Sequence, residues 1–243
     1  MVKSNSVKVK TGVPGLDKVF KGGIRVGSSV LLSGGPGTGK TIFTMHFLLE
    51  GLKNKEPCMY ILYDTKNKFL DYADSLGLDL RKYYDNGLFT IIEQPVVGRQ
   101  FAGLSAPLAM IKKKKIKRVV LDSLTMFAYV HTMQEKEYRQ EIMSCINGMK
   151  DVTLLATTEA VEADFDSIRF KPEEFLFDGV IFLARVRDEA AFERVLHVSK
   201  MRAQEHMLNV VPFSIGAGGI KVYPDQMPFS LIEQENGNKD KFQ

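Results

Sequence analysis

The stretch SSVLLSGGPGTGKT at residues 28–41 decides the fold of this chain of 243 residues. A short apolar run, 28–33, leads into GGPGTGKT at 34–41, which satisfies the pattern G-x-x-x-x-G-K-[ST]. Its glycines let the backbone turn so that consecutive N–H groups point at phosphate oxygens. Lys40 can reach the β- and γ-phosphates, and the Thr41 hydroxyl can hold Mg²⁺. The following apolar-periodic helix adds its positive N-terminal end, so the stretch predicts a phosphate site between a strand and a helix.

Short apolar runs recur along the chain and alternate with helical patterns. The runs are apolar on both faces, as buried parallel strands are; they cover 28–33, 58–63, 88–92, 118–122, 152–156 and 180–184. Helical patterns lie between them, at Ile42, Met45, His46, Leu49 and Leu52, over 104–115, and at Tyr138, Ile142, Ile146 and Met149. This alternation predicts an α/β fold in which helices cover both faces of a mostly parallel twisted sheet.

The pattern changes after Arg185. Three strand-like runs, 195–200, 209–215 and 219–223, follow one another without intervening helices. No Pro/Gly/Ser-rich linker separates them from the rest, so we expect an antiparallel β extension of the same sheet. The polar ends at 1–10 and 233–243 are expected to be flexible tails, which leaves 11–232 as one domain.

Composition excludes several classes of protein. Apolar residues make up 44% and charged residues 26%, which argues against collagen-like, coiled-coil and wholly disordered chains. A net charge of +4 does not demand nucleic acid as a partner. No apolar run approaches the roughly 18–20 residues of a membrane span, and the start MVKSNSVKVKTG has no apolar signal region. Cys58 and Cys145 form no C-x-x-C pair, which fits a reducing cytoplasm.

A second acidic ligand for Mg²⁺ is predicted at Asp122. This residue ends the apolar run Val119-Val120-Leu121, the pattern of a Walker B strand. An acid at the carboxyl end of a parallel strand faces the crevice where ligands bind. Thr41 and Asp122 are therefore the two candidate metal ligands.

Further motifs add a family resemblance. They are TGVPGLD at 11–17, GGI at 22–24, SGGPGTGKT at 33–41, VVLDS at 119–123, TTE at 157–159, DGV at 178–180, KMR at 200–202 and GIKVYP at 219–224. Together they make the chain similar, over 11–224, to the KaiC-like branch of the RecA superfamily of ATPases. KaiC carries two such domains in tandem, and this chain resembles the family's single-domain members.

The resemblance implies a RecA-like core that binds ATP with Mg²⁺. It also implies a ring, usually a hexamer, with ATP between subunits. In that ring Lys200 and Arg202 would reach the neighbour's γ-phosphate and offset the charge that develops there. Ser75, Met201 and His206 match further nucleotide-contacting positions. The phosphate-loop contacts would come from Gly35, Pro36, Gly37, Thr38, Gly39, Lys40, Thr41 and Ile42.

The chain departs from the family pattern at positions that bear on chemistry. Asp64-Thr65 stands where the family usually has two glutamates, the first of which polarises the attacking water. Asp64 keeps a carboxylate that is one methylene shorter, and it could instead cap a helix. Ala203-Gln204 replaces Gly-Thr, and Gly216-Ala217 replaces an often-seen Thr/Ser-Asp. These changes predict a slow ATPase, or a protein that binds ATP and barely hydrolyses it.

Three functions remain open on this evidence: a ring-forming ATPase switch, an ATP-binding regulatory scaffold with negligible hydrolysis, and a recombinase-like ATPase that grips single-stranded DNA. The loop segment 158–176 holds six acids against two bases, which would repel a phosphate backbone, so nucleic acid is not the expected partner. A protein partner is left open, although no residue identifies one. The basic run at 112–118 is interpreted as a helix end, where cations complement the macrodipole. Its alternative is contact with an acidic partner or with nucleic acid.

Overall fold

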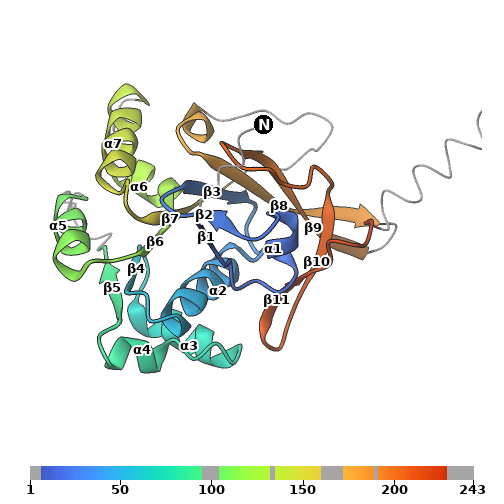
Figure 1. Ribbon diagram of the computed structural model, residues 1–243, viewed down its shortest axis with the longest axis horizontal. Helices are drawn as coiled ribbons and strands as arrows, with labels where there is room; N and C mark the ends of the chain where they lie inside the picture. The colour runs from blue at the N-terminus through green and yellow to red at the C-terminus, as the bar shows by residue number, and fades with distance from the viewer. Residues whose placement is uncertain (1–6, 95–103, 132–134, 160–171, 189–190, 229–243) are drawn as a thin grey trace, which may run out of the picture.

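The computed structural model, shown in Figure 1, describes residues 7–94, 104–131, 135–159, 172–188 and 191–228. Its described residues form a nine-stranded sheet in the order β11-β10-β9-β8-β3-β7-β6-β4-β5. Every neighbouring pair from β8 to β5 is parallel. The parallel strands are β3 (Ser29–Gly34), β4 (Cys58–Leu62), β5 (Phe89–Glu93), β6 (Arg118–Asp122), β7 (Thr153–Glu159) and β8 (Gly179–Asp188).

The C-terminal strands extend this sheet with antiparallel pairs. They are β9 (Ala191–Met201), β10 (Val211–Gly216) and β11 (Gly219–Val222). The predicted α/β sheet with an antiparallel C-terminal extension is thus confirmed. The predicted strand ends agree with the structure to within a few residues, except that β8 and β9 continue further as a long hairpin.

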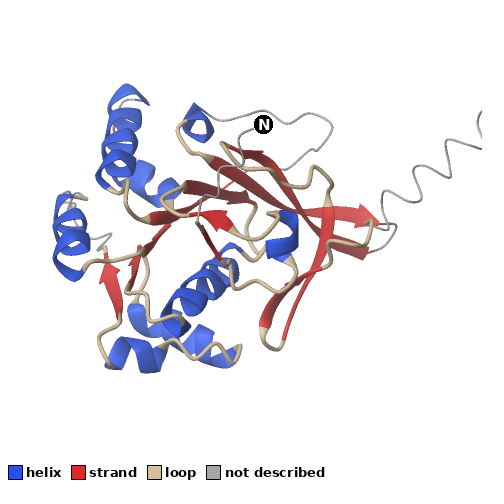
Figure 2. Ribbon diagram, in the orientation of Figure 1, coloured by secondary structure: helices blue, strands red, loops and turns tan. Residues whose placement is uncertain are grey.

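Helices cover both faces of the sheet, as expected (Figure 2). One apolar cluster joins α1 (Leu16–Val19), α2 (Lys40–Lys53) and α3 (Lys66–Ser75), and the other joins α5 (Ser105–Lys114), α6 (Leu124–His131) and α7 (Glu135–Gly148). Strand β3 contributes to both, since Val30 and Leu32 face the first cluster and Leu31 faces the second. The remaining helical elements are the short helix α4 (Arg81–Asp85) and the 3₁₀ turn η1 (Pro172–Phe175).

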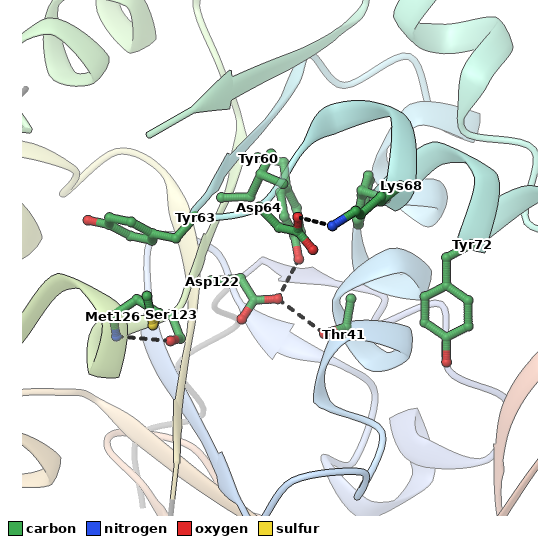
Figure 3. Close-up of a pocket in the computed structure, with 11 residues that line it drawn as sticks. Thr41, Tyr60, Tyr63, Asp64, Lys68, Tyr72, Asp122, Ser123 and Met126 are labelled. Atoms are coloured by element: carbon green, nitrogen blue, oxygen red, sulfur yellow. Dashed lines mark hydrogen bonds and ion pairs between the residues drawn. The ribbon is translucent and has the colours of Figure 1, made fainter. Parts of the chain in front are cut away.

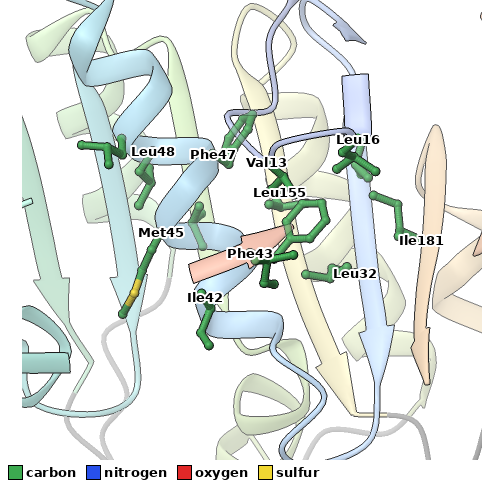
Figure 4. Close-up of a cluster of buried hydrophobic side chains, with 14 of the residues drawn as sticks. Val13, Leu16, Leu32, Ile42, Phe43, Met45, Phe47, Leu48, Leu155 and Ile181 are labelled. Carbon is green, nitrogen blue, oxygen red and sulfur yellow. The ribbon is translucent and has the colours of Figure 1, made fainter. Parts of the chain in front are cut away.

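Helix α2 is the centre of the larger core. Phe43 and Phe47 are fully buried and pack between the sheet and the N-terminal segment, close to Leu16 and Leu32 (Figure 4). His46, on the same helix, is 6% exposed, and its Nε2 accepts a hydrogen bond from Ile220 N–H at 3.0 Å. His46 is thus packed in the core, in keeping with its place in the apolar helical pattern at 42–52. This burial fixes the first turn of α2, which carries the end of the phosphate loop.

The N-terminal segment is also tied to the domain. Strand β1 (Lys8–Val9) pairs with β2 (Ile24–Arg25) in a two-stranded antiparallel sheet. Lys8 Nζ donates to Phe20 O at 3.1 Å, so this part of the predicted tail 1–10 is paired. The predicted C-terminal tail, 233–243, lies outside the described residues. Within the described part of the chain, no helix is long and apolar enough to cross a membrane.

Candidate nucleotide site

The phosphate loop occupies the connection between β3 and α2. Gly37 and Gly39 adopt positive φ angles of 72° and 105°, in the left-handed region that favours glycine. A Cβ at Gly39 would also lie 2.8 Å from Ile215 Cδ1, so a side chain there would collide with β10. Thr38 Oγ1 donates to Gly35 O at 2.8 Å and braces the loop from within. The local geometry agrees with the loop predicted from the sequence.

Lys40 lies over this loop. Its Nζ donates to Gly34 O at 2.8 Å and to Gly35 O at 3.0 Å. Burial lowers the pKa of Lys40, while the nearby carboxylates of Glu159 and Asp122 act in the opposite direction. A partly desolvated ammonium favours a strong anion beside it, which is what a phosphate chain in the loop would supply.

Asp122 ends β6 beside the first turn of α2, where the Walker B prediction requires it. Its carboxylate accepts hydrogen bonds from Thr41 Oγ1 at 3.2 Å and from the Tyr60 hydroxyl at 2.6 Å (Figure 3). Thr157 Oγ1, from β7, donates to the other carboxylate oxygen. Burial, with a further contribution from Asp122, raises the pKa of Tyr60 well above its usual value, so the phenol stays a donor at neutral pH.

The sequence did not identify Tyr60 and Thr157 as site residues. Thr157 belongs to the TTE motif, and Tyr60 is one of the apolar-looking residues of β4. Tyr60 lies opposite Val120 on the neighbouring strand β6, two residues before Asp122. A long polar side chain two residues from a strand end was the available signal.

A cavity of about 430 Å³ opens beside Thr41 and Asp122 (Figure 3). Asp64 lies in its wall, next to Lys68 and Tyr72 of α3. The wall is completed by Tyr60, Leu62, Tyr63, Phe69, Ser123 and Met126. The structure therefore brings the predicted water-positioning carboxylate into the same cavity as both predicted metal ligands.

Asp64 is already engaged within the chain. Its exposed carboxylate accepts a hydrogen bond from Thr65 N–H at 2.7 Å and lies 3.4 Å from Lys68 Nζ. The next helical N–H, that of Lys66, is bound by Glu93 Oε1 at 2.6 Å. Thr65 is the N-cap residue of α3, so Asp64 binds the N–H just outside the helix, and Glu93 from β5 binds the first N–H inside it.

Lys200 and Arg202 lie at the opposite end of the sheet from their own phosphate loop. Lys200 pairs with Val180 near the start of β8, whereas the loop begins beside Leu183. Val180 and Leu183 are separated by roughly 10 Å along the strand, because a strand advances about 3.3 Å per residue. Strand β9 also lies two strand spacings, about 10 Å, from β3 across the sheet. These two cations cannot reach the loop of their own chain.

Each of these cations is held by a carbonyl of η1. Lys200 Nζ donates to Glu174 O at 3.0 Å, and Arg202 Nη2 donates to Phe175 O at 3.0 Å. Burial, with the neighbouring charge of Arg202, lowers the pKa of Lys200. The pair thus forms a fixed positive edge on the far side of the domain.

The remaining predicted nucleotide contacts are spread over the domain. Ser75 is exposed at the end of α3, where its Oγ donates to Tyr72 O at 2.7 Å. His206 follows β9, and its Nδ1 lies 2.9 Å from Met207 O. The side chains of Ile42 and Met201 pack in the core at 4% and 7% exposure. None of these four side chains lines the cavity at Asp122.

The departures that follow Arg202 have structural consequences. Ala203 adopts φ 54°, a left-handed conformation that the glycine of the family pattern would take without strain. The Gln204 amide donates to Phe20 O at 3.0 Å and Gly23 O at 2.7 Å, and it accepts from Arg25 N–H at 2.9 Å. Gln204 therefore joins β9 to the N-terminal segment and has a structural task.

The basic run divides into two parts. Lys112, Lys113 and Lys114 are exposed in the last turn of α5, as the helix-end interpretation predicts. Arg118 is 2% exposed instead. It pairs with Glu56 at 2.5 Å and donates to Lys10 O at 2.7 Å. The expected basic patch at 112–118 is thus smaller than the sequence implies.

Two further expectations concern the cysteines and the acidic segment 158–176. Cys58 and Cys145 are buried free thiols. Groups of three or more His, Cys, Asp or Glu suited to hold a metal ion are not found among the described residues. Residues 160–171, which make up most of that segment, lie outside the described residues.

Fold and site together define a class of protein. A glycine-rich phosphate loop joins β3 to α2, an acid ends a strand beside it, and the central sheet is parallel with an antiparallel extension. That combination is typical of a P-loop ATPase with a RecA-like core. The chain matches the family model "ATPase: KaiC" over residues 9–227, so it belongs to the KaiC ATPase family, and family membership implies nucleotide binding.

Related proteins agree with this assignment. The chain is 33% identical over 232 residues to the circadian clock oscillator protein KaiC of Parasynechococcus marenigrum, covering 89% of this chain and 45% of that protein. It is 34% identical over 237 residues to KaiC of Prochlorococcus marinus subsp. pastoris, covering 91% and 46%. The chain therefore spans about half the length of these curated relatives.

A solved structure matches over its whole length. The crystal structure of a KaiC-like protein from Pyrococcus horikoshii OT3 superposes with a TM-score of 0.78 at 32% identity. The match covers 90% of this chain and all of that one. The RecA-like fold is thus shared by a relative of similar extent.

Proposed function

We propose that this chain is a slow, Mg²⁺-dependent ATPase that acts as a nucleotide-controlled ring. The observation that carries the proposal is the group around the phosphate loop. Thr41 Oγ1 and an Asp122 carboxylate oxygen lie 3.2 Å apart, and Asp64 lines the same cavity. A metal ligand pair and a carboxylate for the attacking water therefore converge beside the place where the terminal phosphates would lie.

The donor set fits Mg²⁺. Hydroxyl and carboxylate oxygens are the ligands that this hard cation prefers, and it is commonly held by one or two protein oxygens together with phosphates. Thr41 and Asp122 would hold it, and the bound ion would neutralise charge on the phosphates. The donations from Tyr60 and Thr157 keep the Asp122 carboxylate in a fixed orientation.

Asp64 is the proposed water-positioning residue. Its carboxylate is exposed to the cavity, but Thr65 N–H and Lys68 already bind it. A short side chain held at its strand end is poorly placed to follow a water toward the phosphate. Since a misplacement of about 1 Å can cost around a hundredfold in rate, slow turnover is the expected result.

The ring is proposed from the position of Lys200 and Arg202. Both lie at the end of the sheet remote from their own phosphate loop, so a single chain would hydrolyse ATP without them. In a closed ring, hexameric in our proposal, they would serve the next subunit's site in trans. Such a cation offsets charge on the phosphoryl oxygens and can be worth about 10³–10⁵ in rate.

The test combines phosphate release with subunit mixing. Mg·ATP turnover is measured for the wild type, for Lys40→Ala and for Arg202→Ala. We expect Lys40→Ala to lose nucleotide binding and Arg202→Ala to bind but not turn over. When the two variants are mixed, Arg202 of a Lys40→Ala subunit would reach the intact phosphate loop of a neighbouring Arg202→Ala subunit. Turnover would then be partly restored. Unchanged ATP affinity in Lys40→Ala would overturn the site, and a mixture without restored turnover would overturn the trans arrangement.

An ATP-binding scaffold with negligible hydrolysis is the second candidate. The engagement of Asp64 by Lys68 and Thr65 favours it, because a bound carboxylate leaves the water without a partner. ATP binding that depends on Lys40 without measurable turnover would select this alternative. The recombinase-like function has no comparable observation in its favour, and nucleic acid is not part of the proposal.

A further inference from the structure

The β8–β9 hairpin extends past the phosphate loop. Leu183 pairs with Gly34, where β3 ends, but β8 continues to Asp188. The two backbones are close here, since a Cβ at Gly34 would lie 2.5 Å from Leu183 O. The residues of β8 that follow Leu183 therefore stand beside the loop, and the β9 residues that pair with them lie one strand further out.

Arginines occupy the hairpin face that looks toward the loop. Leu183 and Leu196 pair and belong to the core on the α2 side. The pair two residues further along, Arg185 and Arg194, shares their face because side chains alternate along strands. Arg185 confirms the direction, because its Nη2 lies 3.5 Å from Pro36 O of the loop.

Among the residues that the structure describes, no carboxylate forms an ion pair with either of these two cations. Like charges directly opposite on neighbouring strands destabilise a sheet. The acid in this part of the hairpin, Glu193, pairs with Val186 and so lies on the other face. Among the described residues, Arg194 Nε is buried and has no hydrogen-bond partner. Within the described part of the chain, this arginine pair therefore has no anion as a partner.

We propose that Arg185, backed by Arg194, binds a phosphate group of the nucleotide held in the phosphate loop of the same chain. This inference rests on the proposed function, because it assumes that the loop binds a nucleotide. The planar guanidinium matches phosphate oxygens with two parallel N–H groups, which an ammonium cannot do. Arg185 thus supplies, within one subunit, a phosphate contact independent of Lys200 and Arg202.

The experiment is calorimetric titration of the full chain with Mg·ATP. The variants are Arg185→Gln, Arg185→Lys and the control Arg187→Gln, which removes the same charge two residues further from the loop. We expect Arg185→Gln to weaken ATP binding about tenfold to a hundredfold, the range of a charge-assisted hydrogen bond. Arg185→Lys should lose less, and Arg187→Gln should bind almost as the wild type does.

A second copy of the chain could instead supply an acidic group to the same arginines. Assembly mass is therefore measured in parallel without nucleotide. Weaker ATP binding with unchanged assembly supports the inference. Unchanged ATP affinity in Arg185→Gln overturns it, whether assembly is lost or kept. Failure of the proposed function is distinguishable, since it would appear as absent ATP binding in the wild type or as normal binding in Lys40→Ala.

Discussion

Restoring the family's glutamate at position 64 should accelerate ATP hydrolysis. Asp64 sits in the wall of the cavity beside Asp122, with its carboxylate turned to Thr65 N–H at 2.7 Å. The Asp64→Glu substitution adds one methylene, which moves the carboxylate by about 1.5 Å, one carbon–carbon bond. That displacement exceeds the roughly 1 Å that can change a rate a hundredfold.

Two effects of the substitution can be compared. The contact with Lys68 joins side chains that are 64% and 74% exposed, and an exposed pair at this spacing contributes about 0.3–0.5 kcal/mol. Loosening it changes the rate by about twofold at most. The reach of the carboxylate therefore dominates, and we expect turnover to rise between tenfold and a hundredfold with little change in ATP affinity.

The assay is steady-state phosphate release at saturating Mg·ATP. Asp64→Asn keeps the size and removes the charge, so it should abolish the remaining turnover. Lys68→Met removes only the ion pair and should change the rate no more than about twofold. If Asp64→Glu is no faster and Asp64→Asn no slower than the wild type, Asp64 does not position the water.

Three further predictions concern stability. Ala203→Gly should raise the free energy of unfolding by up to about 1 kcal/mol, because it relieves the strain of the left-handed backbone at Ala203. Part of that gain is offset by the greater entropy of glycine in the unfolded chain. Urea denaturation measures the change, and a loss of stability would contradict the strain. Arg118→Met should destabilise the fold by about 3 kcal/mol, since it leaves Glu56 unpaired and removes the donations to the carbonyls of Lys10 and Phe47. An unchanged urea midpoint would refute this. Burial lowers the pKa of His46 below its usual 6.5, so the unfolded chain takes up the proton first and stability should fall as the pH drops through about 6.5. His46→Gln should weaken that fall between pH 7.5 and 5.5, and His197, whose pKa burial also lowers, accounts for part of the remainder; an equal pH dependence in wild type and variant would refute the role of His46.

Local pattern was enough to predict most of the framework. The strands before Gly34 and Asp122 are runs of buried apolar residues on both faces, a pattern that parallel sheets impose because helices cover both sides. The phosphate loop was predictable for a similar reason. Its glycines, Lys40 and Thr41 act through backbone geometry within eight consecutive residues, so their spacing alone carries the information.

The partners of Asp122 and the position of Lys200 depend on strands that are neighbours in the sheet but distant in sequence. Tyr60 and Thr157 reach Asp122 only because β4 and β7 flank β6 in the sheet order. The same order sends Lys200 away from its own loop, since β9 runs antiparallel to β8 and ends where β8 begins.

By itself, then, the sequence determined the α/β class, the glycine-rich loop and the place of Asp122 as the acid that ends a strand. Each of these depends on residues adjacent along the chain. The tertiary structure decided which groups hold Asp122, that Arg118 is buried rather than part of a basic surface, and that Arg185 lies against the loop. These depend on strand order, register and side-chain burial, which packing across the sheet fixes and no short segment encodes.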